Sequence, residues 1–208
     1  MPHMTPNIVP IIRYDDPAAA ISWLVRAFGF EKVNAHSVRW GAGIVAVTAH
    51  DRGIYVSGSS PQHSLTDPGG ISWTFGHDYL GARPGEVSIV PEIRYRDLAG
   101  AERWLHEIGF EKTFEVPGPG GVPTHIEMRL GGGHVFLSAL SPEGEYADLT
   151  QFTNVIVDDP DAHHARAAAA GANVVIAPRD TPFGARFYAV RDPENALWWV
   201  STYRPAKP

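Results

Sequence analysis

The stretch that decides the fold is IVPIIRYDD at residues 8–16, because it returns as IVPEIRYRD at residues 89–97. The likeness continues downstream, where FGFEK at 28–32 corresponds to IGFEK at 108–112. A weaker third copy, FTNVIVDDPDAHHARAAAAGA, covers residues 152–172. Self-similarity at long spacing predicts a structural unit that is repeated along the chain.

Each copy has the same order of signals. A short β-branched run ends in an Asp that can cap a helix, and Pro17 and Pro160 take the favoured first helical position. A glycine ends each helix (Gly29, Gly109, Gly171). Three strand candidates follow in the second copy, at 110–116, 124–130 and 134–140. The unit therefore reads βαβββ.

The fold class predicted is α+β, with three βαβββ modules at 7–60, 87–142 and 150–205. Residues 61–86 are rich in turn-forming residues and do not match the unit. They form either a linker or the remnant of a deleted module, in which 71–75 would be the surviving first strand.

The amino-acid composition excludes several classes of function. The 208 residues are 44% hydrophobic and 19% charged, with a net charge of −6, so we expect no nucleic-acid partner. The absence of cysteine excludes disulfides and thiolate metal sites. No apolar run reaches the length of a membrane span, and the first residues lack the order of a signal peptide. We expect a cytoplasmic protein without membrane contact.

These modules resemble the vicinal oxygen chelate superfamily, which includes glyoxalase I, extradiol dioxygenases and bleomycin resistance proteins. The resemblance is carried by the repeated units and by the final stretch DTPFGARFYAVRDPENALWW at 180–199. It implies that two modules pair into a half-barrel cup, with the helices outside and the ligand inside. We take 87–205 as the complete cup. The first module then has no partner within the chain, which predicts a homodimer.

The resemblance also locates the metal ligands of the metal-dependent members, about seven residues from the Asp residues that close the first strands and open the last turn. Those places hold apolar or aromatic residues here: Val9, Val90, Phe152 and Trp199, with Leu137 or Ser138 in the second module. The resemblance therefore implies a binding site that uses no metal and stacks planar groups on aromatic rings.

Alternation along the strands predicts which side chains face the cup. The candidate ligand-binding residues are Glu92, Arg94, His125, Glu127, Arg129, Phe152, Asn154 and Trp199. Ile93, Tyr95, Ile126, Met128 and Leu130 should face the helix. Trp198 should pack beneath the helix, opposite Trp199.

We expect a metal-independent protein that sequesters or carries a partly planar small organic ligand, such as an antibiotic. The alternative is a metal-dependent lyase, isomerase or dioxygenase with a relocated divalent-metal site at His125, Glu127 and Glu92. A third reading is a structural module with a collapsed cup. For Glu127, pairing with Arg129 or Arg94 is favoured over an acid–base pair with His125.

Two further expectations concern the third module. His163 and His164 should lie at a solvated helix start, and Asn195-Ala196, in place of the usual Gly-containing pair, should make the last hairpin irregular.

Overall fold

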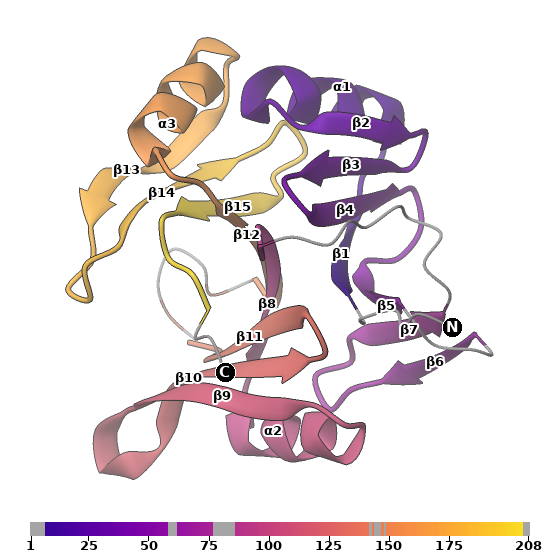
Figure 1. Ribbon diagram of the computed structural model, residues 1–208, viewed down its shortest axis with the longest axis vertical. Helices are drawn as coiled ribbons and strands as arrows, with labels where there is room; N and C mark the ends of the chain where they lie inside the picture. Colours follow the sequence, from indigo (N-terminus) through magenta and orange to yellow (C-terminus); the bar gives the residue numbers. More distant parts are fainter. Residues whose placement is uncertain are drawn as a thin grey trace.

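The computed structural model describes residues 7–57, 62–76, 86–141, 143, 147 and 149–205. Its strands form two sheets (Figure 1). The first sheet contains β1 (Ile8–Arg13), β2 (Glu31–Asn34), β3 (Ser37–Trp40), β4 (Gly43–Thr48), β5 (Gly53–Ser57), β6 (His63–Thr66) and β7 (Ser72–Gly76). The second contains β8 (Ile89–Tyr95), β9 (Glu111–Pro117), β10 (Pro123–Leu130), β11 (Gly133–Ala139), β12 (Gln151–Ile156), β13 (Asn173–Asp180), β14 (Arg186–Arg191) and β15 (Leu197–Ser201).

The three helices of the described residues begin and end as the sequence signals predict: α1 (Pro17–Phe28), α2 (Leu98–Glu107) and α3 (Pro160–Ala169). The Asp16 carboxylate caps α1 by accepting from the backbone N–H groups of Ala18 and Ala19. Gly29 follows α1 with φ of 74°, a left-handed conformation that glycine adopts without steric cost.

The second sheet joins two modules in one surface. Its strand order is β13-β14-β15-β12-β8-β11-β10-β9. The first strands of the two modules, β8 and β12, pair antiparallel at the centre, and each is parallel to the last strand of its own module. Figure 1 shows α2 and α3 on the outside of this sheet. The α+β class with paired βαβββ modules is thus the observed architecture.

The first module has a partner within the chain, contrary to expectation. The first sheet has the order β2-β3-β4-β1-β5-β7-β6, and β5 pairs antiparallel with β1 as β12 does with β8. Because β5 covers the open edge of β1, the reason for expecting a homodimer no longer holds.

Strands β5, β6 and β7 form a shortened module whose described residues include no helix. β7 is parallel to β5 and antiparallel to β6, the pattern that β15 makes with β12 and β14. The expectation that 71–75 forms a first strand was therefore wrong: β7 is a last strand, and β5, placed by the sequence in the first module, is the first one. Residues 58–61 and 77–85 lie outside the described part.

The turn before β7 repeats the turn before β15. The Asp67 carboxylate accepts from the backbone of Gly69 and Ile71 and from the indole of Trp73. Asp192 likewise accepts from Glu194 and Ala196 and from the indole of Trp198, six residues downstream. The spacing D-P-x-x-x-x-W is shared, which identifies the shortened module as a truncated copy of the unit.

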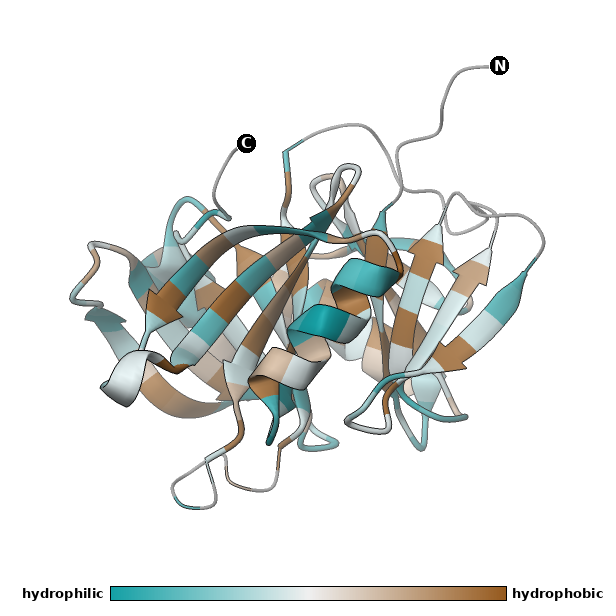
Figure 2. Cartoon of the chain, turned by 90° about the horizontal axis from the view of Figure 1, so that it is seen from below, coloured by the Kyte–Doolittle hydropathy of each residue, from teal (hydrophilic) through white to brown (hydrophobic). Residues whose placement is uncertain are grey.

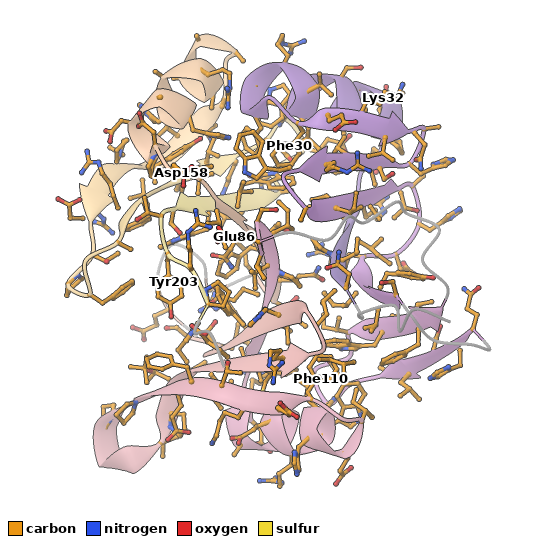
Figure 3. The ribbon with its side chains drawn as sticks, in the orientation of Figure 1. Phe30, Lys32, Glu86, Phe110, Asp158 and Tyr203 are labelled. Carbon is orange, nitrogen blue, oxygen red and sulfur yellow. The ribbon has the colours of Figure 1, made fainter. Side chains whose placement is uncertain are left out.

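The two sheets are held together by two buried cores. One core joins α1 and α3 and includes Phe28, whose ring lies 5.2 Å from that of Trp198. The other joins α2 to both sheets, and there Trp73 lies 5.7 Å from Trp104. Figure 2 shows α2 between the strands of the two sheets, with hydrophobic and hydrophilic bands alternating along those strands. In Figure 3, Phe30 lies between α1 and the sheets, and Phe110 beside α2.

The expectations for the third module were wrong in two details. His163 is buried rather than solvated: its Nδ1 lies 2.7 Å from the hydroxyl of Tyr188, and its ring packs against Phe28. Asn195 adopts the left-handed conformation at φ of 71°, and its N–H donates to the Asp192 carbonyl. An asparagine thus performs the glycine's role, and the hairpin is regular.

Within the described residues, no helix has both the length and the apolar character needed to cross a bilayer.

Candidate functional site

The cup is the face of the second sheet that carries Glu92, Phe136, Phe152, Asn154 and Trp199. Register fixes this face, because side chains of residues paired across neighbouring strands point the same way. Glu127 pairs with Phe136, Phe136 with Glu92, and Glu92 with Phe152. Val90, Asn154 and Trp199 form the next row.

The opposite face packs on the helices, as predicted from alternation. Ile93, Tyr95, Ile126 and Met128 belong to the core around α2, and Leu130 packs against it. Trp198 is fully buried in the other core, whereas Trp199 faces the cup. The predicted sidedness of these strands is confirmed. The ligand-binding role of the cup residues stays a prediction.

Aromatic rings form one wall of the cup. The ring of Trp199 stacks on Phe187 at 4.3 Å between centroids, with the planes 6° apart. Phe152 lies 6.3 Å from Trp199, and the Arg179 guanidinium lies 5.2 Å from the centre of Phe187. Phe187 is buried, but Phe152 and Trp199 are half-buried and leave part of their rings accessible. This wall can receive a planar group by stacking and dispersion.

A buried polar group occupies the other side of the cup. Glu127 is fully buried, and its carboxylate accepts a hydrogen bond from the hydroxyl of Tyr203. The Nε2 atom of His125 lies 3.8 Å from the same carboxylate oxygen. Burial lowers the pKa of His125, but the hydrogen bond to Glu127 and the charges of Glu92 and Glu127 outweigh it and raise that pKa. This arrangement favours a protonated imidazole beside the carboxylate.

Tyr203 comes from the segment after β15 and covers part of the cup. Its ring joins a small apolar cluster with Val90, Phe136 and Ile156, and it lies 5.9 Å from the ring of Phe136. Figure 3 shows Tyr203 between β15 and the lower strands of the sheet. Sequence reasoning missed Tyr203 because it follows the last strand and belongs to no repeated position.

Glu92 and Asn154 connect the aromatic wall to the polar group. The side-chain amide of Asn154 donates to Glu92 at 3.1 Å and to the carbonyl of Val90 at 3.3 Å. Arg94, on the same strand as Glu92, donates to the carbonyl of Leu149. The register therefore places all eight predicted residues on one face, with Arg129 at its outer edge.

Arg129 is the exception to the predicted pairing. Its guanidinium binds Glu111 at 2.6 Å and the Gly131 carbonyl, so it belongs to the outer edge of the sheet and does not neutralise Glu127. His134, paired with Arg129 across the hairpin, is buried, and burial lowers its pKa. Of the two favoured pairings of Glu127, with Arg129 or with Arg94, the one with Arg129 was wrong. Of the described residues, His125 and Tyr203 contact the carboxylate.

The described residues of the cup hold no cluster of side chains that fits a metal ion. Across the described ranges, no three His, Asp or Glu side chains gather closely enough to bind one, and His125, Glu127 and Glu92 do not form such a group. The rings of Trp199 and Phe152, at positions that the resemblance assigns to metal ligands, also supply no nitrogen or oxygen lone pair.

Comparison with known proteins agrees with this fold. The model of the Glyoxalase/Bleomycin resistance protein/Dioxygenase superfamily matches residues 87–200, which is more than half of the chain. The chain belongs to this superfamily. The resemblance seen in the sequence is therefore confirmed, and the matched residues are those that build the cup.

Curated relatives have a related but longer chain. "Putative glyoxylase CFP32" of Mycobacterium bovis and of Mycobacterium tuberculosis is in each case 30% identical over 142 residues. The match covers 68% of this chain and 42% of the relative. The chain thus spans less than half the length of these relatives.

Solved structures extend the likeness to both sheets. The 2,3-dioxygenase LapB from Pseudomonas sp. KL28 has a TM-score of 0.62 at 10% identity, covering 97% of this chain and 93% of that one. The Mn(II)-bound glyoxalase from Novosphingobium aromaticivorans has a TM-score of 0.62 at 12% identity, covering 94% and 80%. At such identities the likeness establishes the fold alone.

Proposed function

We propose that this chain binds a partly planar organic molecule in the cup without a metal ion, and sequesters or carries it. The observation that carries the proposal is the stack of Trp199 on Phe187, with Phe152 beside it and part of both Trp199 and Phe152 accessible. Each additional aromatic stack contributes roughly 0.5–1.5 kcal/mol beyond the buried area. An aromatic antibiotic or other xenobiotic has the ring surface that this wall suits.

The polar part of the cup supports the same proposal. A ligand lying against Trp199 would meet the carboxylate of Glu92, which already accepts from Asn154. Carboxylate oxygens accept hydrogen bonds from amino or hydroxyl groups, and a positively charged ligand also gains from their charge. A planar ligand bearing a donor at one end therefore matches the wall and the row beside it.

The second candidate is an enzyme in which His125 and Glu127 transfer protons. The buried contact between Tyr203 and Glu127, with His125 alongside, favours it, because buried and coupled ionisable groups are typical of catalytic sites. The proteins similar in structure to this chain include dioxygenases and a glyoxalase. The metal-dependent form of this candidate lacks a group of three donors in the described residues.

The test begins with a thermal-shift screen, because a ligand that binds the native state raises the melting temperature. One plate holds planar aromatic antibiotics and the other divalent cations (manganese, iron, nickel and zinc). Binding of each planar hit is then measured by titration calorimetry on the wild type, Trp199→Ala and Trp199→Phe. We expect Trp199→Ala to weaken binding about tenfold and Trp199→Phe to retain most of it.

The control is Leu65→Ala, which removes a partly exposed apolar side chain from the other sheet. It should leave the affinity unchanged. A stoichiometric divalent ion found in the protein by elemental analysis, and lost in Glu127→Gln, would overturn the metal-independent proposal in favour of the second candidate.

A further inference from the structure

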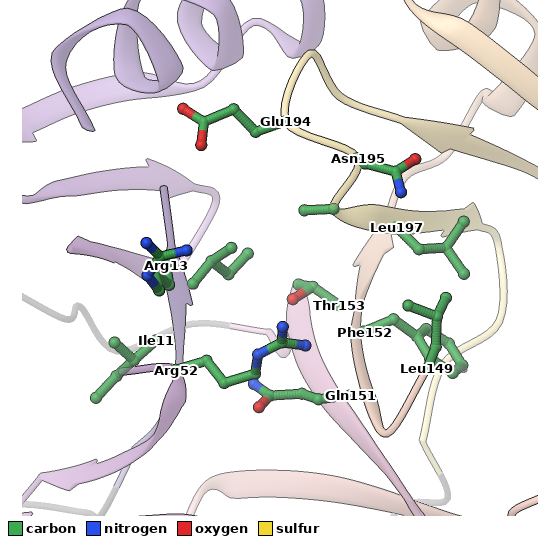
Figure 4. A pocket seen from close by; sticks show the side chains of 12 residues that line it. Ile11, Arg13, Arg52, Leu149, Gln151, Phe152, Thr153, Glu194, Asn195 and Leu197 are labelled. Carbon is green, nitrogen blue, oxygen red and sulfur yellow. The ribbon is translucent and has the colours of Figure 1, made fainter. Parts of the chain in front are cut away.

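A cavity of about 240 Å³ lies at the seam between β1 of the first sheet and β12 of the second. We call it the seam cavity, and Figure 4 shows its walls. It is smaller than the roughly 300–1,000 Å³ of sites for drug-sized ligands, so its size suits a small metabolite. The lining side chains are Ile11, Ile12, Arg13, Arg52, Leu149, Gln151, Phe152, Thr153, Glu194, Asn195, Ala196 and Leu197.

Two guanidinium groups give the seam cavity a positive edge. Arg13 forms an ion pair with Asp15 at 2.7 Å, and both side chains are exposed. Arg52 makes no ion pair or hydrogen bond with any of the described residues, so its charge is available to a ligand. An arginine binds a carboxylate through two parallel hydrogen bonds, which selects for planar anions.

The one carboxylate in the wall, that of Glu194, already accepts hydrogen bonds within the protein. Both oxygens of Glu194 accept from the backbone at the start of α1, one from the N–H of Asp15 and one from that of Asp16 at 2.9 Å. Hydrogen bonds from a helix start stabilise the carboxylate, and Glu194 points toward α1 in Figure 4. Its charge is thus directed away from Arg52.

Two polar atoms in the wall lack partners. Gln151 is only 8% exposed; its amide nitrogen donates to the carbonyl of Gly53 at 3.2 Å, and its oxygen accepts from no group of the described residues. Thr153 is fully buried, and its hydroxyl has no partner in that part of the chain. Buried polar groups are nearly always paired, so these two unpaired ones on one wall are candidates to bind a ligand there.

We propose that the seam cavity binds a small organic anion that carries a hydroxyl group, a hydroxycarboxylate. The carboxylate binds Arg52, with Arg13 adding positive charge. The ligand's hydroxyl donates to the oxygen of Gln151 and accepts from the hydroxyl of Thr153. The carbon skeleton contacts the apolar part of the wall, where Leu149 and Leu197 lie.

This site lies on a different face of β12 from the cup, although Phe152 borders both. Gln151 and Thr153 alternate with Phe152 and Asn154 along β12, so the two pairs point to opposite faces of the strand. Binding of an anion at Arg52 therefore does not depend on the stack at Trp199, and the two proposals can fail independently.

The test is titration calorimetry of the full chain with lactate, malate and citrate, each beside its analogue without the hydroxyl: propionate, succinate and tricarballylate. We expect at least one hydroxy acid to bind, and to bind about tenfold more tightly than its analogue. Arg52→Gln should weaken binding about tenfold or more. Thr153→Val, which keeps the shape of the side chain, should reduce the preference for the hydroxyl.

The matched control is Arg103→Gln, an exposed arginine on α2, which should bind like the wild type. Trp199→Ala should also bind the anion normally. No heat from any of the three hydroxy acids at about 10 mM would overturn the proposal. Equal affinity of Arg52→Gln and Arg103→Gln for the hydroxy acid would also overturn it. This comparison remains valid even if Thr153→Val does not fold. Equal affinity for each hydroxy acid and its analogue would overturn the roles of Gln151 and Thr153.

Discussion

The hydroxyl of Tyr14 donates a hydrogen bond to the carboxylate of Asp192 over 2.5 Å, although 178 positions separate the two residues. Tyr95 makes the same contact with Asp67. Tyr14 directly follows β1 and Tyr95 ends β8, each the first strand of a module, and the aspartate opens the last turn of a module in the other sheet. These two contacts relate the halves of the molecule by an approximate internal symmetry.

Tyr14→Phe and Tyr95→Phe should each lower the free energy of unfolding by about 1–3 kcal/mol, because each leaves a buried carboxylate short of a donor. Urea denaturation measures this. The two sites share no residue, so the double variant should lose the sum of the single losses. A change below a few tenths of a kcal/mol in both single variants would contradict the role of these contacts.

The pH dependence of the unfolding free energy should reflect the protonation of His163. Burial, with the charge of Arg166, lowers its pKa to about 4 in the folded protein, below the usual 6.5. The unfolded chain therefore binds the proton more readily, and stability is lost as the pH falls from 6.5 toward 4. We expect His163 to contribute roughly 2 kcal/mol to the difference in unfolding free energy between pH 7 and pH 5.

Urea denaturation of His163→Gln at both pH values checks this contribution. The difference between pH 7 and pH 5 should shrink relative to the wild type, whatever the loss of stability at pH 7. His50→Gln, at an exposed position, should leave the difference unchanged. An unaltered pH profile in His163→Gln would show that this side chain is not held neutral.

The electrostatics of the cup can be measured through His125. In Glu127→Gln the pKa of His125 should fall, because the carboxylate that raises it is gone while burial still lowers it. Titration of the imidazole by NMR gives the value directly. Glu111→Gln, on the exposed edge strand β9, is the control and should not change it. A constant pKa in Glu127→Gln would mean that the two groups do not interact.

The left-handed turn at Asn195 predicts opposite effects for two substitutions. Asn195→Gly should change the unfolding free energy by less than about 0.5 kcal/mol, since glycine accepts positive φ. Asn195→Val should cost about 1–2 kcal/mol or more, because a β-branched side chain collides with the backbone there. Thermal denaturation distinguishes them, and equal stabilities would show that the turn relaxes.

Much of the fold could be predicted because the same capping and strand signals recur in each repeated unit of the sequence. The caps at Asp16 and Gly29, and the alternation that separates Trp198 from Trp199, depend on neighbours in sequence. The sequence offered a remnant module only as one of two readings of 61–86 and misplaced its strands, because the described residues there include no helix like those of the other copies. The one signal that this module retains is the spacing from Asp67 to Trp73, which repeats that from Asp192 to Trp198.

For the site, the sequence predicted which residues of the strands face the cup. Alternation placed Glu92, Phe152 and Asn154 on one face, but it carries no information on segments that fold back over that face. Tyr203 and the seam cavity depend on contacts between residues far apart in the chain. The same limit applies to His163, whose burial results from the packing of α1 on α3.

Because the described residues of the shortened module include no helix, α2 contributes to a core that both sheets share. On the opposite flank, α1 and α3 together cover the two sheets, whereas α2 packs on β8–β11 of the second sheet and reaches the first sheet through Trp104 against Trp73. Destabilising substitutions in α2 should consequently cause both sheets to unfold in one cooperative transition.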